Sequence, residues 1–138
     1  MERTIKVGRE VDELTESVTM VFYGHPIFTP FPSPRLAVAD ISEYGVTLFF
    51  SDRIGDTTIR QKLVYRWNSI VNVVTFGHYI YFGGKPETYI NNLPITVTFC
   101  DSRSKSCLIP LTILRLSEKC KEMFCNKIIN RGGECKCL

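Results

Sequence analysis

The chain has 138 residues, of which 44% are hydrophobic and 12% aromatic, and its formal net charge is +3. A single domain of this size and composition buries a core without disulfide or metal staples. Residues 105–138 carry seven basic and three acidic groups, whereas residues 1–16 carry three basic and five acidic ones. This basic excess is weaker than the dense stripe of most nucleic-acid-binding domains, so the charge favours other functions.

Residues 1–18 (MERTIKVGREVDELTESV) lack the apolar core of a targeting peptide. No run of about eighteen uncharged apolar residues follows them, so we expect a cytoplasmic protein without a transmembrane segment. Residues 1–17 form a charged segment ahead of the predicted domain. Six cysteines in a cytoplasmic protein are normally free thiols or metal ligands, although intracellular proteins of hyperthermophiles often form disulfides.

The first β-prone residues, SVTMVFYG, lead into a stretch that contains Pro26, Pro30, Pro32 and Pro34. Such a density of proline excludes both a helix and a ladder strand. Residues 35–40 and 45–52 then predict two strands, joined by a hairpin turn that ends at Gly45.

Residues 59–67 (IRQKLVYRW) alternate between apolar and basic side chains, which predicts a strand with one buried face. The apolar face holds Ile59, Leu63, Tyr65 and Trp67, and the opposite face holds Arg60, Lys62, Val64 and Arg66. We expect Trp67 to be buried against a C-terminal helix and the basic face to be solvated.

Two further strands are predicted within residues 71–84, separated by Gly77, and residues 85–94 are expected to form a loop. Residues 95–111 predict a hairpin. A two-residue turn at Arg103 and Ser104 would place Cys100 directly opposite Cys107.

The helical period lies near the end of the chain, where one apolar stripe holds Ile113, Leu116, Cys120, Phe124 and Ile128. The sequence NRGG marks its C-terminal stop, so we expect a helix of about 15 residues. The predicted fold is mainly β with one C-terminal α-helix. It has about seven strands in a bent antiparallel sheet or partly open barrel, and the helix caps its open end.

This layout is similar to the pleckstrin-homology-like (PH-like) superfamily, including its GRAM and bacterial variants. The resemblance covers residues 18–131 and leaves 132–138 as a cysteine-rich tail. The stretches that carry it are RLAVAD with GVTLFFSD, QKLVYRWNSIVNVVTF, ITVTFC with CLIPL, and LSEKCKEMF. A narrower likeness, on DTTIRQ and TVTF, is to the PH-like part of the archaeal chemotaxis adaptor family. It implies an adaptor within a larger archaeal chemotaxis or motility assembly.

The C-terminal cysteines suggest three alternatives, of which a zinc site is the first. Cys120, Cys125, Cys135 and Cys137 have the spacing C-x4-C-x9-C-x-C, but Cys120 and Cys125 lie about 140° apart around a helix and cannot both face one metal ion. A site of Cys125, Cys135 and Cys137 stays open, although its spacing is not typical of structural zinc. We therefore predict no metal and no cofactor. A prenylation signal is the second alternative, but CKCL has Lys136 where an aliphatic residue belongs.

Disulfides are the third alternative. Cys100 can reach Cys107 across the predicted hairpin, and Cys125 can reach Cys135 or Cys137 through the glycine-containing turn. Six reduced cysteines fit the sequence equally well.

The two histidines give no catalytic arrangement. His25 lies in the proline-rich stretch and His78 follows Gly77, and the chain contains no G-x-S-x-G, H-E-x-x-H or P-loop sequence. We therefore predict that the protein is not an enzyme.

The basic face formed by Arg60, Lys62 and Arg66 is the candidate partner-binding surface, although charges of this kind also protect ordinary strand edges from aggregation. We expect a non-enzymatic interaction or adaptor module that docks a protein partner through this face or an open sheet edge. The alternative is binding of nucleic acid or an anionic membrane by the same face, with Trp67, Tyr79 and Tyr81 beside it.

Overall fold

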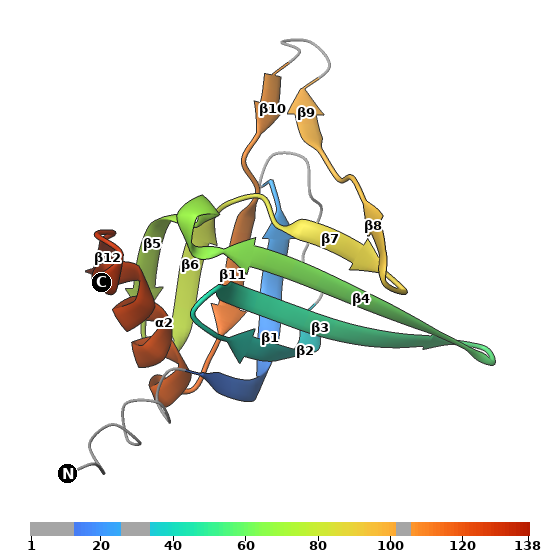
Figure 1. The fold of residues 1–138 in the computed structure, drawn as a ribbon, viewed down its shortest axis with the longest axis horizontal. Coiled ribbons are helices and arrows are strands. Elements are labelled where there is room, and N and C mark those ends of the chain that lie inside the picture. Colours follow the sequence, from blue (N-terminus) through green and yellow to red (C-terminus); the bar gives the residue numbers. More distant parts are fainter. Residues whose placement is uncertain (1–12, 26–33, 102–105) are drawn as a thin grey trace.

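The computed structural model describes residues 13–25, 34–101 and 106–138. Within them the chain is mainly β, with one α-helix near the C-terminal end (Figure 1). The elements are β1 (Leu14–Gly24), β2 (Arg35–Ile41), β3 (Gly45–Ile54), β4 (Thr57–Arg66), the 3-10 helix η1 (Trp67–Ser69), β5 (Val71–Phe76), β6 (Tyr79–Gly83), β7 (Glu87–Ile90), β8 (Leu93–Ile95), β9 (Phe99–Asp101), β10 (Ser106–Leu108), β11 (Leu111–Arg115), α2 (Glu118–Asn130) and β12 (Cys135–Cys137).

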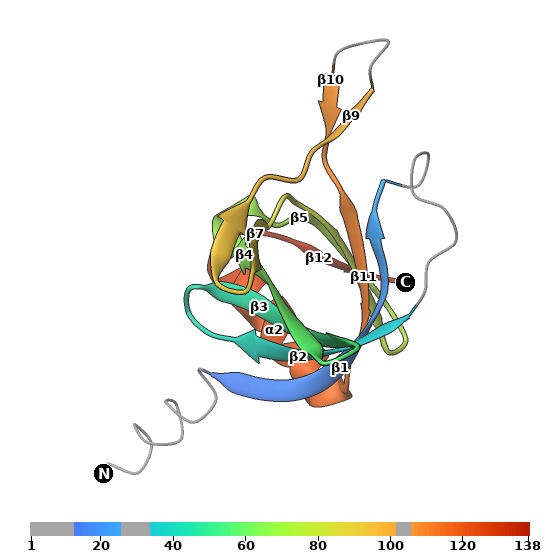
Figure 2. The same ribbon diagram turned by 90° about the vertical axis from the view of Figure 1, so that its right-hand side faces the viewer.

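Ten of these strands form one open sheet in the order β12-β5-β6-β11-β1-β2-β3-β4-β7-β8. Every neighbouring pair is antiparallel except β12 and β5, which run parallel. β9 and β10 form a separate two-stranded ribbon that projects from the body (Figures 1 and 2). The predicted mainly β fold with a C-terminal helix is confirmed, but the predicted count of about seven strands is wrong.

Some of the strands that the sequence did not predict lie in residues 85–94, which were expected to form a loop. They contain β7 and the start of β8, joined by a tight turn at Asn91 and Asn92. Both asparagines have positive φ, 50° and 67°, as a two-residue hairpin turn requires. Asparagine tolerates this conformation better than most residues do, so the pair of asparagines is itself the hairpin signal.

The sheet is strongly curled. Tyr65 on β4 and Phe82 on β6 are separated by four strands in the sheet order, yet their ring centroids lie only 5.1 Å apart. This contact forms because the sheet bends until the inner faces of its two halves meet (Figure 2). Inside, the buried Tyr65 hydroxyl and Thr112 Oγ1 share a hydrogen bond of 2.8 Å, so neither oxygen is left unsatisfied.

Helix α2 packs at one end of the curled sheet. It begins after Ser117, whose hydroxyl accepts a hydrogen bond from the Cys120 N–H and donates one to Glu16 on β1. It ends before Gly132, whose φ of 86° suits a helix C-terminus. The helix has 13 residues and buries Cys120, Met123, Phe124 and Ile128.

The predicted helical stripe began too early. Ile113 belongs to β11, and Leu116 lies in the connection that follows it. The burial of Thr112, Leu114 and Leu116 alternates with period two, as expected for a strand, and over this short stretch that pattern overlaps the helical one.

Two boundaries differ from those expected. β1 begins at Leu14, inside the segment assigned to residues 1–17. At the other end, Cys135–Cys137 form β12, which pairs with Val73–Thr75 of β5, and Cys135 packs half-buried against the core. Residues 132–138, set apart as a tail by the resemblance, therefore include a strand of the main sheet.

The expected burial of Trp67 is confirmed. Its side chain is only 5% exposed and meets the Phe124 ring edge-on, with centroids 5.3 Å apart. The indole Nε1–H donates to the Ser42 carbonyl at 2.8 Å, so the polar atom of the ring is also satisfied.

We predict that Trp67→Ala lowers the free energy of unfolding by about 3–5 kcal/mol, because it leaves a cavity beside Phe124. Urea denaturation followed by circular dichroism measures the change. Tyr44→Ala removes an exposed aromatic from the neighbouring turn and serves as the control, with an expected effect within about 0.5 kcal/mol. Equal stability of the two variants would contradict the packing described.

We predict that deletion of residues 134–138 costs about 1–2 kcal/mol of folding free energy, because it removes the backbone partner of β5 and the half-buried Cys135. Thermal melts of the truncated and full chains measure the loss. Lys136→Ala changes only an exposed side chain and should melt with the full chain. A truncated chain as stable as the full one would show that β12 adds nothing.

Candidate functional site

The three basic residues predicted on one face of β4 do lie on its outer face, but they are not equivalent. Arg66 pairs with Glu87 of β7, with Nε 3.0 Å from Oε2. The hydrogen bond from this guanidinium holds the pKa of Glu87 below its ordinary value. Arg66 is therefore engaged within the fold, which leaves Arg60 and Lys62 as the two cations available to a partner.

Arg60 and Lys62 are held by β7 and its turn. Lys62 Nζ lies 4.6 Å from the centroid of the Tyr89 ring, a cation–π contact that leaves its charge in place. The backbone N–H of Arg60 donates to Asn91 Oδ1 at 3.0 Å, and the Asn91 N–H donates to the Arg60 carbonyl at 2.7 Å. The guanidinium itself is exposed, and within the described residues neither cation has a carboxylate partner.

The same outer face carries apolar side chains on the neighbouring strands. In register, Val38 of β2 lies opposite Phe49 of β3, Phe49 opposite Lys62, and Lys62 opposite Tyr89. Paired residues of adjacent strands point to the same face, so these four form one row across the sheet. Leu36 and Arg60 lie two residues along their strands from Val38 and Lys62, and alternation places them on the same face.

These residues line a hollow of about 550 Å³, which we call the outer groove. The apolar residues at one end are strongly exposed for their type: Leu36 by 79%, Val38 by 40% and Phe49 by 43%. Arg60, Lys62 and Tyr89 line the other end. The groove is thus apolar on the β2 and β3 side and cationic on the β4 and β7 side.

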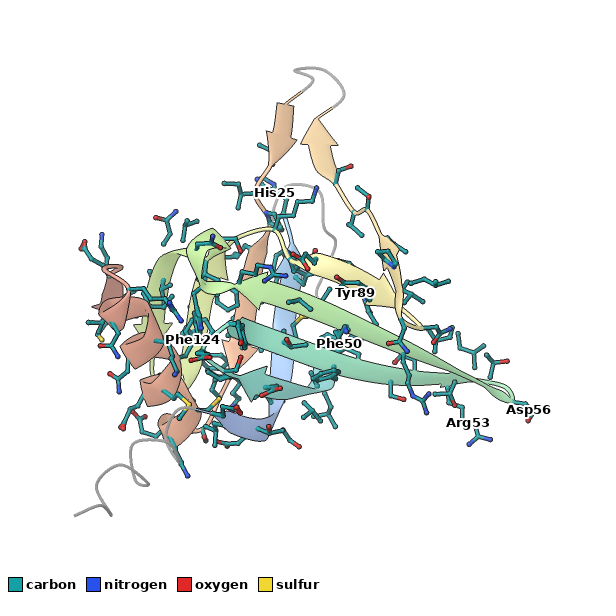
Figure 3. All side chains as sticks on the ribbon, viewed as in Figure 1. His25, Phe50, Arg53, Asp56, Tyr89 and Phe124 are labelled. Carbon is teal, nitrogen blue, oxygen red and sulfur yellow. The ribbon has the colours of Figure 1, made fainter. Side chains whose placement is uncertain are left out.

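The inner face behind the groove is tied together by Arg35 of β2. Its guanidinium lies 4.4 Å from the centroid of the Phe50 ring, pairs with Asp52 at 2.6 Å and donates to Gln61 at 3.1 Å. These contacts join β2, β3 and β4. Beyond them β3 and β4 continue as a projecting hairpin, whose tip carries Arg53 and Asp56, far from Phe124 at the helix end (Figure 3).

The groove's apolar residues were not identified from the sequence. The signal that could have found them is the absence of a polar face in β2 and β3, since LAVA and LFF place apolar residues on both faces. An exposed strand normally alternates with polar residues, so apolar residues at outward positions indicate a covered or binding surface. Their meeting with Arg60 and Lys62 also depends on the strand register, which the sequence does not state.

The open sheet edge at β8 is a poor docking site for another strand. In a hairpin with a two-residue turn, the residue pair next to the turn is hydrogen-bonded, and here that pair is Ile90 and Leu93. The following pair, Tyr89 and Pro94, is therefore not hydrogen-bonded, so the backbone of Pro94 faces the open edge. Proline has no N–H to donate, and β8 has only three residues. Of the two predicted docking surfaces, the geometry therefore favours the face over this edge.

The aromatic residues expected beside the basic face are placed elsewhere. Trp67 is buried under α2, and its Nε1–H is used within the fold. Tyr79 and Tyr81 lie on β6, which is separated from β4 by four strands in the sheet order. The structure does not bring these three rings together with Arg60 and Lys62.

The described cysteines, Cys120, Cys125, Cys135 and Cys137, are free thiols. Cys120 is buried in the core, whereas Cys135 Sγ lies 3.8 Å from the Cys125 carbonyl and Cys137 is exposed. Over residues 13–25, 34–101 and 106–138, no three histidine, cysteine or acidic side chains are placed to hold a metal ion. The two candidate disulfides from Cys125 are thus not formed in this structure.

Cys100 and Cys107 are register partners in the β9–β10 ribbon, as the predicted hairpin requires. Their thiols lie outside the part of the structure that is described, so the disulfide between them stays a prediction. The turn residues Arg103 and Ser104 also lie outside it.

The two histidines lie on separate connections. His25 follows β1, and His78 is exposed in the turn between β5 and β6. The His78 carbonyl accepts a hydrogen bond from the Leu116 N–H at 2.8 Å, which joins this turn to the segment before α2. The backbone of His78 thus contributes to the attachment of the helix.

Comparisons of the chain with models of protein families, with curated proteins and with solved structures found no match. Among the described helices, none has the length and apolar character needed to cross a membrane. The functional argument therefore rests on the geometry of the outer groove.

We predict that the four described thiols react with iodoacetamide in the order of their exposure, with Cys137 fastest and Cys120 slowest. Burial raises the pKa of Cys120 and of Cys125 to about 12, so little reactive thiolate is present at neutral pH. Peptide mapping by mass spectrometry over a time course measures each rate. Urea-unfolded protein is the control, in which the rates should converge; equal rates in the folded chain would contradict the burial.

Proposed function

We propose that this chain is a non-enzymatic interaction module of the PH-like type, which binds a protein partner in the outer groove. The PH-like part of the proposal is supported by the bent, largely antiparallel sheet and by the C-terminal helix that packs at one end of it. The ten-stranded sheet exceeds the seven strands that the resemblance implies. β7, β8 and β12 are the short additions at its edges.

The observation that carries the proposal is the composition of the outer groove. Single exposed apolar side chains are common, but Leu36, Val38 and Phe49 lie on two adjacent strands in one hollow. Protein interfaces combine such an apolar centre with a polar rim, and tyrosine and arginine are enriched in them. Tyr89 and Arg60 occupy the rim here.

The same groove is a weak candidate for nucleic acid. Binding by counterion release needs several free cations along the phosphate backbone, and single strands also need exposed aromatic rings for stacking. Arg66 is paired with Glu87 and Trp67 is buried, so the groove supplies two cations and one half-buried tyrosine. An apolar–basic groove of this kind suits a protein segment better.

The test is affinity purification with quantitative mass spectrometry from the cell that naturally makes the protein. We predict that Phe49→Ser reduces recovery of the specific partner at least tenfold, because it removes the centre of the apolar row. Phe76→Ser is the matched control, since Phe76 is 56% exposed on β5, outside the groove. Both variants should melt with the wild type.

Two results would contradict the proposal. If Phe49→Ser recovers the same partners as the wild type, the groove does not bind them. If Phe76→Ser loses the partner as completely as Phe49→Ser does, binding depends on another surface.

A further inference from the structure

The outer groove is polarised along its length. Its apolar end is on β2, at Leu36 and Val38, and its cationic end is on β4, at Arg60 and Lys62. Adjacent strands lie about 4.8 Å apart, so the two ends are separated by about 10 Å, with Phe49 of β3 between them. A ligand that fills the groove must therefore offer two different chemistries about 10 Å apart.

The charge of the cationic end is uncompensated. The carboxylates on the two strands that flank β4 are already engaged: Asp52 of β3 pairs with Arg35 at 2.6 Å, and Glu87 of β7 pairs with Arg66 at 3.0 Å. Over the described residues, Arg60 and Lys62 have no ion-pair partner of their own. Charge complementarity thus requires an anionic group at this end.

We propose that the occupant of the groove is an acidic peptide segment of the partner, with an apolar side chain on Val38 and Phe49 and a carboxylate on Arg60 and Lys62. This inference rests on the proposed function and adds the chemistry of the partner to it. An extended chain spans the required 10 Å in about three residues. The planar guanidinium of Arg60 suits a carboxylate, which it binds through two parallel hydrogen bonds.

A membrane surface fits the groove less well than a peptide does. Side chains that enter a bilayer must protrude, whereas Val38 and Phe49 line a hollow. Two cations also give only a small attraction to anionic lipid, about 1 kcal/mol each near the surface. A peptide side chain can enter the hollow, and its backbone can follow the sheet surface.

The probe is a phage-displayed library of random peptides about twelve residues long, which extend to ~40 Å and so exceed the groove. Panning on the wild-type protein should enrich peptides in which aspartate or glutamate lies within about four residues of leucine, isoleucine or phenylalanine. A synthetic peptide of the most enriched sequence should bind the double variant Arg60→Glu/Lys62→Glu at least tenfold more weakly in fluorescence anisotropy. Replacing its acidic residues with lysine should reverse this preference.

The matched control is Arg115→Glu/Lys119→Glu, which reverses two exposed cations near the helix and should bind the peptide as the wild type does. Enrichment of peptides with no acidic preference would overturn the proposal. So would failure to enrich any peptide that distinguishes the wild type from Phe49→Ser. Binding of phosphatidylserine vesicles by the wild type, without any peptide binding, would also overturn it and assign the groove to lipid.

The two proposals fail separately. If the native partner is still recovered with Arg60→Glu/Lys62→Glu but is lost with Phe49→Ser, the groove binds a protein and its acidic chemistry is wrong. If the native partner survives both variants, the groove is not the docking site, whatever peptides it selects.

Discussion

The ring of Phe124 holds the two halves of the sheet together. It lies 5.3 Å from Trp67, which follows β4, and 5.1 Å from Phe82 on β6 (centroid to centroid). β4 and β6 are not hydrogen-bonded to each other, so the curl of the sheet is maintained by side-chain packing and not by the ladder. Together with the contact between Tyr65 and Phe82, this packing keeps the apolar inner face away from water.

Strand β4 contributes side chains both to the core and to the outer groove. Leu63 and Tyr65 are buried in the core, whereas Arg60 and Lys62 line the outer groove. The strand is paired along its whole length with β3, and its central part pairs with β7. The position of the two cations is therefore set by the same packing that stabilises the fold, and the core supports the outer groove from behind.

The parts of the fold that could be predicted are those in which one strand or helix carries its own pattern. Alternation placed Leu63, Tyr65 and Trp67 inside, and the helical period placed Cys120, Phe124 and Ile128 on one side of α2. β8 and β12 have only three residues each, too few for any period to show, and Pro94 argues against a strand. They become strands because the tertiary structure places β7 beside β8 and β5 beside β12.

The candidate site was predictable only in part, for a related reason. The outward direction of Arg60, Lys62 and Arg66 followed from period two, but the pairing of Arg66 with Glu87 joins residues 21 positions apart. The apolar end of the groove lies on strands that precede β4 in the chain, and only the register shows that Val38, Phe49 and Lys62 share a row. A single strand carries no information about which side chains its neighbours will place beside it.

The pair of hydrogen bonds between Asn91 and the backbone of Arg60 has a consequence for binding energetics. Asn91 has a positive φ, and its two hydrogen bonds hold the backbone of Arg60 in place. They thereby set the position from which the Arg60 side chain extends. Ordering a loop on binding costs free energy that weakens affinity, and this site has little backbone left to order. The proposed binding surface is thus preorganised, and the entropy lost on association with a partner would be confined largely to the side chains and to that partner.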